Sequence, residues 1–278
     1  MNIDRDFIHD VVYNFHASIM QDGELCDYSD ISPVNENYDD AIYQKIYALK
    51  YIPAYYFEYC ILANKLSERL ALKKTKHVEI ASFGCGLYPD YFALLHNLDD
   101  IDFEYYGFDI CQWETRTLLP TSEDNIYLHT KSIDSIRESF LRDIDVFIFP
   151  KSLGDIAENI DIPSFADKIA KTRNDTIYFL NSFITVDHKL NKHHVDIFSQ
   201  FHEAMLAAGF KTTDKSGDTF YSGTHERQGL KGIDYSFDYP QDIRLCEDKD
   251  KYNCECRVVH NPVLTNSYMN FQILEYTR

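Results

Sequence analysis

The spacing of apolar residues divides this chain of 278 residues into two parts. Over residues 5–20, and again from residue 38, apolar positions recur at the three- and four-residue spacing of a buried helical face. Pro53 interrupts the second run and is expected to break or kink it, because proline cannot donate the backbone hydrogen bond of a helix interior. We therefore predict an N-terminal helical cap over residues 1–75 and a second domain over residues 76–278.

From residue 77 onward, short apolar runs alternate with helical segments. The five runs that we predict as strands are 77–83, 102–110, 125–130, 143–150 and 175–183. Two later segments, 254–260 and 266–278, alternate between apolar and polar residues like the strands of a C-terminal β-hairpin. Strands interleaved with helices predict an α/β fold with a doubly wound, mostly parallel, Rossmann-like sheet, seven-stranded once the hairpin is included.

The composition narrows the classes of partner. The formal net charge is −18, whereas a protein that holds nucleic acid by its phosphates needs a basic surface. Nucleic acid is therefore a disfavoured partner, although a local groove of lysine and arginine would still permit RNA. No apolar stretch is long enough to span a membrane, and the seven cysteines are scattered and odd in number. We expect a cytoplasmic protein with reduced thiols and no membrane partner.

The stretch VEIASFGCGLYPD carries two of the ten glycines, Gly84 and Gly86, directly after a predicted strand. Pro89 and Asp90 then open a helix, and proline suits the first helical turn. Glycine lets the backbone turn sharply and approach a ligand closely, so we interpret the pair as one wall of a ligand site whose occupant needs the space of a side chain. The same short pattern also occurs in ordinary turns.

The next strand ends in YYGFDI and places Asp109 at its carboxyl end. In an open α/β sheet, ligands bind beyond the carboxyl ends of the strands, where strand order reverses. A carboxylate there can accept hydrogen bonds from both hydroxyls of a ribose, although a loop aspartate can instead cap the following helix. Pro89 replaces the third glycine of a dinucleotide motif, and no phosphate-binding lysine loop is present. The pattern favours a nucleoside without phosphates.

These segments resemble those of the class I S-adenosylmethionine-dependent methyltransferases, over about residues 77–210 and the closing hairpin. The matching segments are SFGCGLYPD, YYGFDI and DVFIFPKSLGDI. Within the superfamily, the chain looks most like poorly characterised bacterial members with FGCG…D, GxD followed by Trp, and FPKS segments. The resemblance implies an enzyme that binds S-adenosyl-L-methionine (SAM) as its cofactor.

The resemblance also implies which residues bind SAM. They are Gly84, Cys85, Gly86, Asp90, Asp109, Ile110, Trp113, Ser132, Ile133 and Pro150. Asp109 would hold the ribose hydroxyls, Ile110 would pack on the adenine, and Trp113 would either cover the adenine or belong to the core. Ser82 and Tyr88 depart from the family pattern, because they replace an acidic residue and a small residue of the glycine motif.

The methyl acceptor is expected beside the fourth strand, where Lys151 and Ser152 are the candidate catalytic residues. Lys151 would orient an anionic acceptor or lower the pKa of a nucleophile, or it is an ordinary solvated loop lysine. The sulfonium methyl is already electrophilic, so the protein mainly has to align the acceptor and exclude water. The segment lacks the [DN]-P-P-[YF] signature of amino-group nucleic-acid methylases.

The predicted cap carries two unusual segments. Tyrosines recur every four residues at positions 43, 47, 51 and 55. They could line an acceptor pocket, but we expect them to pack one helical face onto the main domain. Residues 21–40 are acidic and contain no lysine or arginine, which indicates a solvated loop or a lid over the acceptor.

No metal site is predicted. The set Cys246, Cys254, Cys256 and His260 has a spacing unlike that of zinc knuckles, and in a strand three of these residues would share one face as ordinary core. His193 and His194 lack a carboxylate at convincing spacing.

The sequence as a whole predicts SAM-dependent methyl transfer to a small-molecule or protein acceptor. Two alternatives stay open: an RNA methyltransferase, and a catalytically silent methyltransferase-fold protein that binds a partner.

Overall fold

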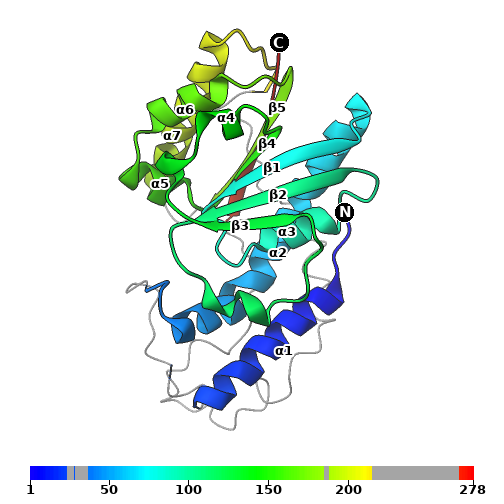
Figure 1. The fold of residues 1–278 in the computed structure, drawn as a ribbon, viewed down its shortest axis with the longest axis vertical. Coiled ribbons are helices and arrows are strands. Elements are labelled where there is room, and N and C mark those ends of the chain that lie inside the picture. Colours follow the sequence, from blue (N-terminus) through cyan, green and yellow to red (C-terminus); the bar gives the residue numbers. More distant parts are fainter. Residues whose placement is uncertain (24–27, 29–36, 185–187, 215–268) are drawn as a thin grey trace.

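In a computed structural model of the protein, the residues that the structure describes are 1–23, 28, 37–184, 188–214 and 269–278. Within them, a six-stranded sheet has helices on both faces (Figure 1). The strands are β1 (His77–Phe83), β2 (Asp102–Asp109), β3 (Ile126–Thr130), β4 (Val146–Pro150), β5 (Thr176–Ile184) and β6 (Met269–Thr277). The helices are α1 (Arg5–Asp22), α2 (Ala41–Lys73), α3 (Pro89–Leu95), η2 (Glu114–Leu118), η3 (Ile133–Ser135), α4 (Glu138–Leu141), α5 (Leu153–Asn159), α6 (Ile162–Ala170) and α7 (His188–Ala207).

The strand order is β3-β2-β1-β4-β5-β6, with the first five strands parallel and β6 antiparallel to β5. The chain runs from β1 outward to β3 and then returns to β4 on the other side of β1, so strand order reverses there. The predicted α/β fold with a mostly parallel sheet is confirmed, and β6 lies where the second hairpin strand was expected. The expected partner strand, 254–260, lies outside the described residues.

The core has two halves, one on each face of the sheet, because successive strand residues point to opposite faces. In β1, Val78 and Ile80 belong to the half that packs against α1, α2 and α3. Ala81 and Phe83 belong to the other half, which packs against α5, α6 and α7. Figure 1 shows the two helical layers on either side of the strands.

Helix α2 differs from the prediction, because it continues through Pro53 instead of ending there. A proline in a helix interior costs about 3 kcal/mol through its missing N–H and its ring. The flanking residues Ile52, Ala54 and Tyr56 are buried in the core, and their burial offsets that cost. The result is one helix of 33 residues in place of two shorter ones.

The two N-terminal helices pack against each other and against α3, and α2 also contacts β6. Phe7 of α1 contacts Tyr56 of α2 and Phe92 of α3, with ring centroids 4.5 and 4.4 Å apart. All three rings lie in the same hydrophobic cluster as β1 residues. A domain boundary at residue 75 stays a prediction, and the helices before it share one core with the strands after it.

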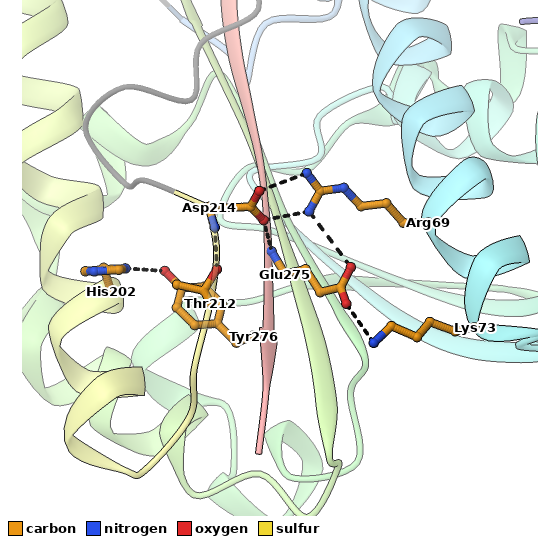
Figure 2. A network of polar contacts seen from close by, with 7 residues as sticks. All are labelled: Arg69, Lys73, His202, Thr212, Asp214, Glu275 and Tyr276. Carbon is orange, nitrogen blue, oxygen red and sulfur yellow. Dashed lines mark hydrogen bonds and ion pairs between the residues drawn. The ribbon is translucent and has the colours of Figure 1, made fainter.

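A polar network fastens α2 to the edge strand β6 (Figure 2). Arg69 donates to both carboxylate oxygens of Asp214, at 2.7 and 3.2 Å. Lys73 pairs with Glu275 at 3.0 Å, and the backbone N–H of Glu275 donates to Asp214 at 2.8 Å. Asp214 therefore ties together the second half of α2, the segment after α7 and the last strand.

Several sequence predictions fall on residues outside the described part of the chain. These are most of the acidic segment 21–40 and the set Cys246, Cys254, Cys256 and His260, and the side chains of His193 and His194 are not described either. Among the helices formed by the described residues, none combines the length and apolar character needed to cross a membrane.

Candidate cofactor and acceptor site

The segments that follow β1, β2 and β4 meet where strand order reverses and enclose a cavity of about 500 Å³. This volume is typical of a small-molecule site, and its position is the one expected for ligands of an open α/β sheet. All predicted site residues except Asp90 line the cavity. They are Gly84, Cys85, Gly86, Asp109, Ile110, Trp113, Ser132, Ile133, Pro150, Lys151 and Ser152.

Both glycines of the motif adopt the left-handed conformation, with φ of 73° at Gly84 and 53° at Gly86. A Cβ at Gly84 would lie 2.5 Å from Cβ of Ser152, and one at Gly86 would lie 3.2 Å from the ring of Trp113. The space that a side chain would need is thus filled by protein atoms. The interpretation that a ligand occupies that space was wrong; backbone conformation and two neighbouring side chains require the glycines.

Asp109 points toward the glycine bend. Its Oδ2 accepts a hydrogen bond from Gly86 N–H at 2.8 Å, and its Oδ1 accepts one from Cys111 N–H at 2.9 Å. The second bond is a local loop contact and not the helix cap anticipated as an alternative, because η2 begins at Glu114 and has no side-chain cap. An ionised carboxylate has about four acceptor positions, so roughly two remain for donors in the cavity that Asp109 lines. The half-buried side chain of Asp109 can therefore hold the loop and still accept hydrogen bonds from two hydroxyl groups of a ligand.

Arg116 binds the carbonyl group of the same residue, Gly86. Its Nε and Nη2 donate to the carbonyl of Gly86 at 3.0 and 2.8 Å, and its guanidinium lies over the ring of Tyr88, 5.7 Å from the centroid. Gly86 thus donates to Asp109 and accepts from Arg116, which fixes the orientation of the bend. Sequence reasoning missed Arg116, because no spacing relates an arginine in η2 to a glycine 30 residues earlier.

Asp90 is the predicted cofactor residue that the structure places elsewhere. It is buried, and its Oδ2 accepts from the hydroxyls of Ser82 and Tyr105 at 2.7 and 2.9 Å. Burial raises its pKa to about 6, and these hydrogen bonds oppose the rise. Ser82 stands where the family has an acidic residue, so Asp90 brings a carboxyl group from α3 to that position on β1.

Apolar side chains flank Asp109 on the side expected for the adenine. Ile110 is 66% exposed and lines the cavity, so a bound ring could cover it. Trp113 is buried between Gly86 and two tyrosines, with ring centroids 5.5 Å from Tyr38 and 5.4 Å from Tyr47. Trp113 therefore belongs to the core and also forms part of the cavity wall. Ser132 and Ile133 lie beyond β3 and complete this side; their contact with adenine stays a prediction.

Lys151 lies in the cavity wall in a strained backbone conformation, with φ of 59°. Its ammonium pairs with the carboxylate of Glu58 from α2 and lies 3.9 Å from the ring centroid of Tyr55. Burial lowers the pKa of Lys151, and the negative charge of Glu58 opposes that effect. Lys151 is therefore not a solvated loop lysine. Sequence reasoning also missed Glu58, which lies 93 residues before its partner.

Pro150 and Ser152 flank Lys151, and hydrogen bonds hold this loop in place. The Ser152 hydroxyl donates to the carbonyl of Phe83, which joins the loop after β4 to the end of β1. The backbone N–H of Lys151 donates to Ser182 Oγ at 3.2 Å. Because the Ser152 hydrogen is already donated to the backbone, the geometry favours a positioning role for this residue over a catalytic one.

The tyrosine stripe of α2 lines the cavity, contrary to the expectation that it only packs α2 onto the main domain. Tyrosines 43, 47, 51, 55 and 59 all contribute, together with Tyr38. Residues four apart lie on one face of a helix, so the stripe forms a continuous surface. Tyrosines at this spacing occur both on helix faces that pack against other elements and on helix faces that line a pocket. The sequence does not distinguish the two cases; the position of α2 in the fold does.

Comparisons with known proteins give distant likenesses. No family model and no curated protein matches the chain. Among solved structures, the plantazolicin methyltransferase BpumL, in complex with a monoazolic desmethylPZN analog and SAH, has 12% identity, a TM-score of 0.48 and 98% coverage of both chains. The cyclopropane synthase MmaA2 from Mycobacterium tuberculosis has 11% identity, a TM-score of 0.38, and coverage of 75% of this chain and 82% of its own.

A third structure, the mycolic acid cyclopropane synthase CmaA1 with SAH and CTAB, has 13% identity, a TM-score of 0.40, and coverage of 75% of this chain and 82% of its own. The BpumL and CmaA1 structures contain SAH, the product of SAM. Likenesses at this level are too weak to assign an activity, so the function has to be argued from the site itself.

Among the described residues, no group of three or more histidine, cysteine, aspartate or glutamate side chains is placed to hold a metal ion.

Proposed function

We propose that the protein transfers the methyl group of SAM to a small-molecule or protein acceptor. The observation that carries the proposal is the carboxylate of Asp109, which is anchored by Gly86 N–H and still has acceptor positions beside a cavity of about 500 Å³. The sequence motifs favour the same ligand, a nucleoside without phosphates.

The residues present fit such a cofactor. Asp109 would accept hydrogen bonds from the ribose hydroxyls, and Ile110 and Ile133 would pack on the adenine. The buried Nε1–H of Trp113 has no acceptor among the described residues, and an acceptor on a ligand would satisfy it. Arg116 lies at the glycine bend, but its guanidinium already donates two hydrogen bonds to the Gly86 carbonyl.

When bound, SAM supplies an electrophilic methyl group on a sulfonium. The work left to the chain is to align the acceptor in line with that methyl group and to exclude water. The loop of Lys151 and Ser152 is rigidly held by Ser182 and Phe83, so it can serve as a fixed wall beside the reacting atoms.

Calorimetry with SAM and SAH tests the cofactor site. We expect micromolar dissociation constants for both, and about a 100-fold loss with Asp109→Ala, because two hydrogen bonds to a charged acceptor contribute about 3 kcal/mol together. Asp124→Ala, at an exposed aspartate before β3, is the matched control and should bind as tightly as the wild type. Thermal melting of each variant checks that the fold is retained.

If neither ligand binds the wild-type protein, the proposal is refuted and the silent scaffold becomes the better description. Transfer of a tritiated methyl group to cell lysate, fractionated into RNA, protein and metabolites, then identifies the acceptor class. The net charge of −18 favours counts in the metabolite or protein fraction.

A further inference from the structure

Six tyrosines line one side of the cavity. This tyrosine wall comprises Tyr38, Tyr43, Tyr47, Tyr51, Tyr55 and Tyr59. Burial raises the pKa of Tyr47, Tyr55 and Tyr59 well above the ordinary value, so these phenols stay protonated and uncharged at physiological pH. The wall therefore offers aromatic faces and neutral hydroxyls, without negative charge of its own.

The middle of the wall is flat. Tyr51 and Tyr55 stack with ring centroids 5.5 Å apart and an interplanar angle of 20°. Tyr47 and Tyr51 are only half-buried, so parts of their rings line the cavity. Aromatic faces bind flat rings by offset stacking, or cations by their negative faces. The position of Lys151 decides between these two possibilities.

Lys151 already occupies the cation position on this wall. Its ammonium lies 3.9 Å from the ring centroid of Tyr55 and 5.1 Å from that of Tyr59, and it pairs with Glu58. A second cation there would meet the charge of Lys151. An anion would gain little, because Glu58 compensates Lys151. The pair has no net charge whether the proton stays on Lys151 or moves to Glu58.

The other charged residues that line the cavity are Asp109, Lys131 and Asp155. Asp109 belongs to the glycine bend, whereas Lys131 and Asp155 are exposed on the loops after β3 and β4. Asp109 acts electrostatically on Tyr47, whereas Lys151 and Glu58 act on Tyr55 and Tyr59, farther along the wall.

We propose that the tyrosine wall and the Lys151–Glu58 pair form the acceptor subsite, and that this subsite takes a planar aromatic molecule without net charge. The inference rests on the proposed function, because an acceptor exists only if the protein transfers a methyl group. Binding of a molecule to the tyrosine wall can be measured whether or not the protein is a methyltransferase. Lys151 and Glu58 then determine specificity: they exclude charged acceptors by remaining paired with each other.

The experiment measures binding of four probes of similar size to the full chain, with and without saturating SAH. The probes are naphthol (neutral and aromatic), naphthoate (anionic), naphthylmethylammonium (cationic) and decahydronaphthol (neutral and saturated). We expect naphthol to bind at least about 10-fold more tightly than each of the other three, because only naphthol combines a flat ring with zero charge. Equal binding of decahydronaphthol, or tighter binding of either ion, would overturn the proposal.

Two variants test the wall itself. Tyr51→Leu removes an aromatic face and keeps an apolar side chain, and it should weaken naphthol binding about 2- to 10-fold. Tyr13→Leu, at a tyrosine of α1 that is 55% exposed, is the matched control and should leave naphthol binding unchanged. An unchanged affinity in Tyr51→Leu would place the probe elsewhere and refute the subsite.

Charge variants test the role of the pair. Glu58→Gln leaves the charge of Lys151 uncompensated and should improve naphthoate binding by about 10-fold or more. Lys151→Met should do the same for naphthylmethylammonium. Each single change disturbs a buried pair, so the double variant Glu58→Gln/Lys151→Met is included; it is neutral again and should prefer naphthol as the wild type does. If none of these variants changes its preference among the charged and neutral probes as expected from the net charge of residues 58 and 151, the pair does not set specificity.

The two proposals fail in distinguishable ways. If SAH binds and naphthol does not, the acceptor subsite is wrong and the cofactor site stands. If naphthol binds in a Tyr51-dependent manner and SAH does not, the subsite stands without the methyltransferase. Competition between SAH and naphthol would show that the wall belongs to the cofactor site and would overturn the inference.

Discussion

The buried carboxyl group of Asp90 allows a quantitative test of the site's architecture. Asp90→Asn keeps the shape of the side chain and an oxygen that can accept from Ser82 and Tyr105, but it cannot ionise. Burial raises the pKa of Asp90 from 3.8 to about 6 in the folded protein. A rise of about two units corresponds to about 3 kcal/mol between the folded and unfolded states.

The sign follows from proton binding. Between the ordinary pKa and the raised one, the folded state holds the proton more tightly than the unfolded state, so the stabilisation is fully present below pH 3.8 and is lost as pH rises to about 6. The asparagine variant does not undergo this loss. We expect its free energy of unfolding to differ from that of the wild type by less than about 1 kcal/mol at pH 4, and to exceed it by about 3 kcal/mol above pH 6.5.

The assay is urea unfolding of both proteins from pH 4 to pH 8, compared as a difference so that other titrating groups cancel. Thr121→Ala, at an exposed residue that cannot ionise, is the control and should show no trend with pH. A difference for Asp90→Asn that stays constant with pH would refute the raised pKa. Because Asp90 does not line the cavity, the variant should also keep the SAM affinity of the wild type; a tenfold loss would restore the original prediction that Asp90 contacts the cofactor.

Three further predictions follow from contacts of single residues. Gly84→Ala should lower the free energy of unfolding by more than about 2 kcal/mol in urea, because a left-handed φ and a Cβ 2.5 Å from Ser152 both oppose it; a neutral effect would contradict the described bend. Arg116→Met should weaken SAH binding about 10-fold in calorimetry with the fold intact, since it releases the Gly86 carbonyl; unchanged affinity would show that the bend needs no such support. Asp214→Asn should cost about 1–3 kcal/mol in urea unfolding, because the acceptor of a two-point arginine contact and of a backbone N–H loses its charge; no change would mean that the network between α2 and β6 adds nothing to stability.

The strands could be predicted well from the sequence, because their signal is local. The first predicted strand coincides with β1, His77–Phe83, where apolar residues end at a glycine. The glycine motif and Asp109 were also placed correctly at the cavity, since both follow from the rule that ligands gather at the carboxyl ends of parallel strands.

What the sequence could not supply are pairings between distant elements. Glu58 and Lys151 meet only because α2 packs beside the loop that follows β4, and Arg116 reaches Gly86 only because η2 packs beside the glycine bend. The break expected at Pro53 did not occur, because tertiary packing of the flanking residues outweighs a local preference. Local rules place elements, and packing decides which of their faces meet.

Helix α2 has a consequence for how this protein can change its substrate. One face of the helix supplies aromatic rings to the cavity, other faces are buried in the core, and its last turns are fastened to β6 through Arg69. The tyrosines that would recognise the acceptor therefore lie on a helix of the hydrophobic core and not on a surface loop. A change in acceptor preference would have to come from replacing individual tyrosines on that one face. The buried residues on the other faces of α2 would have to stay unchanged to preserve the fold.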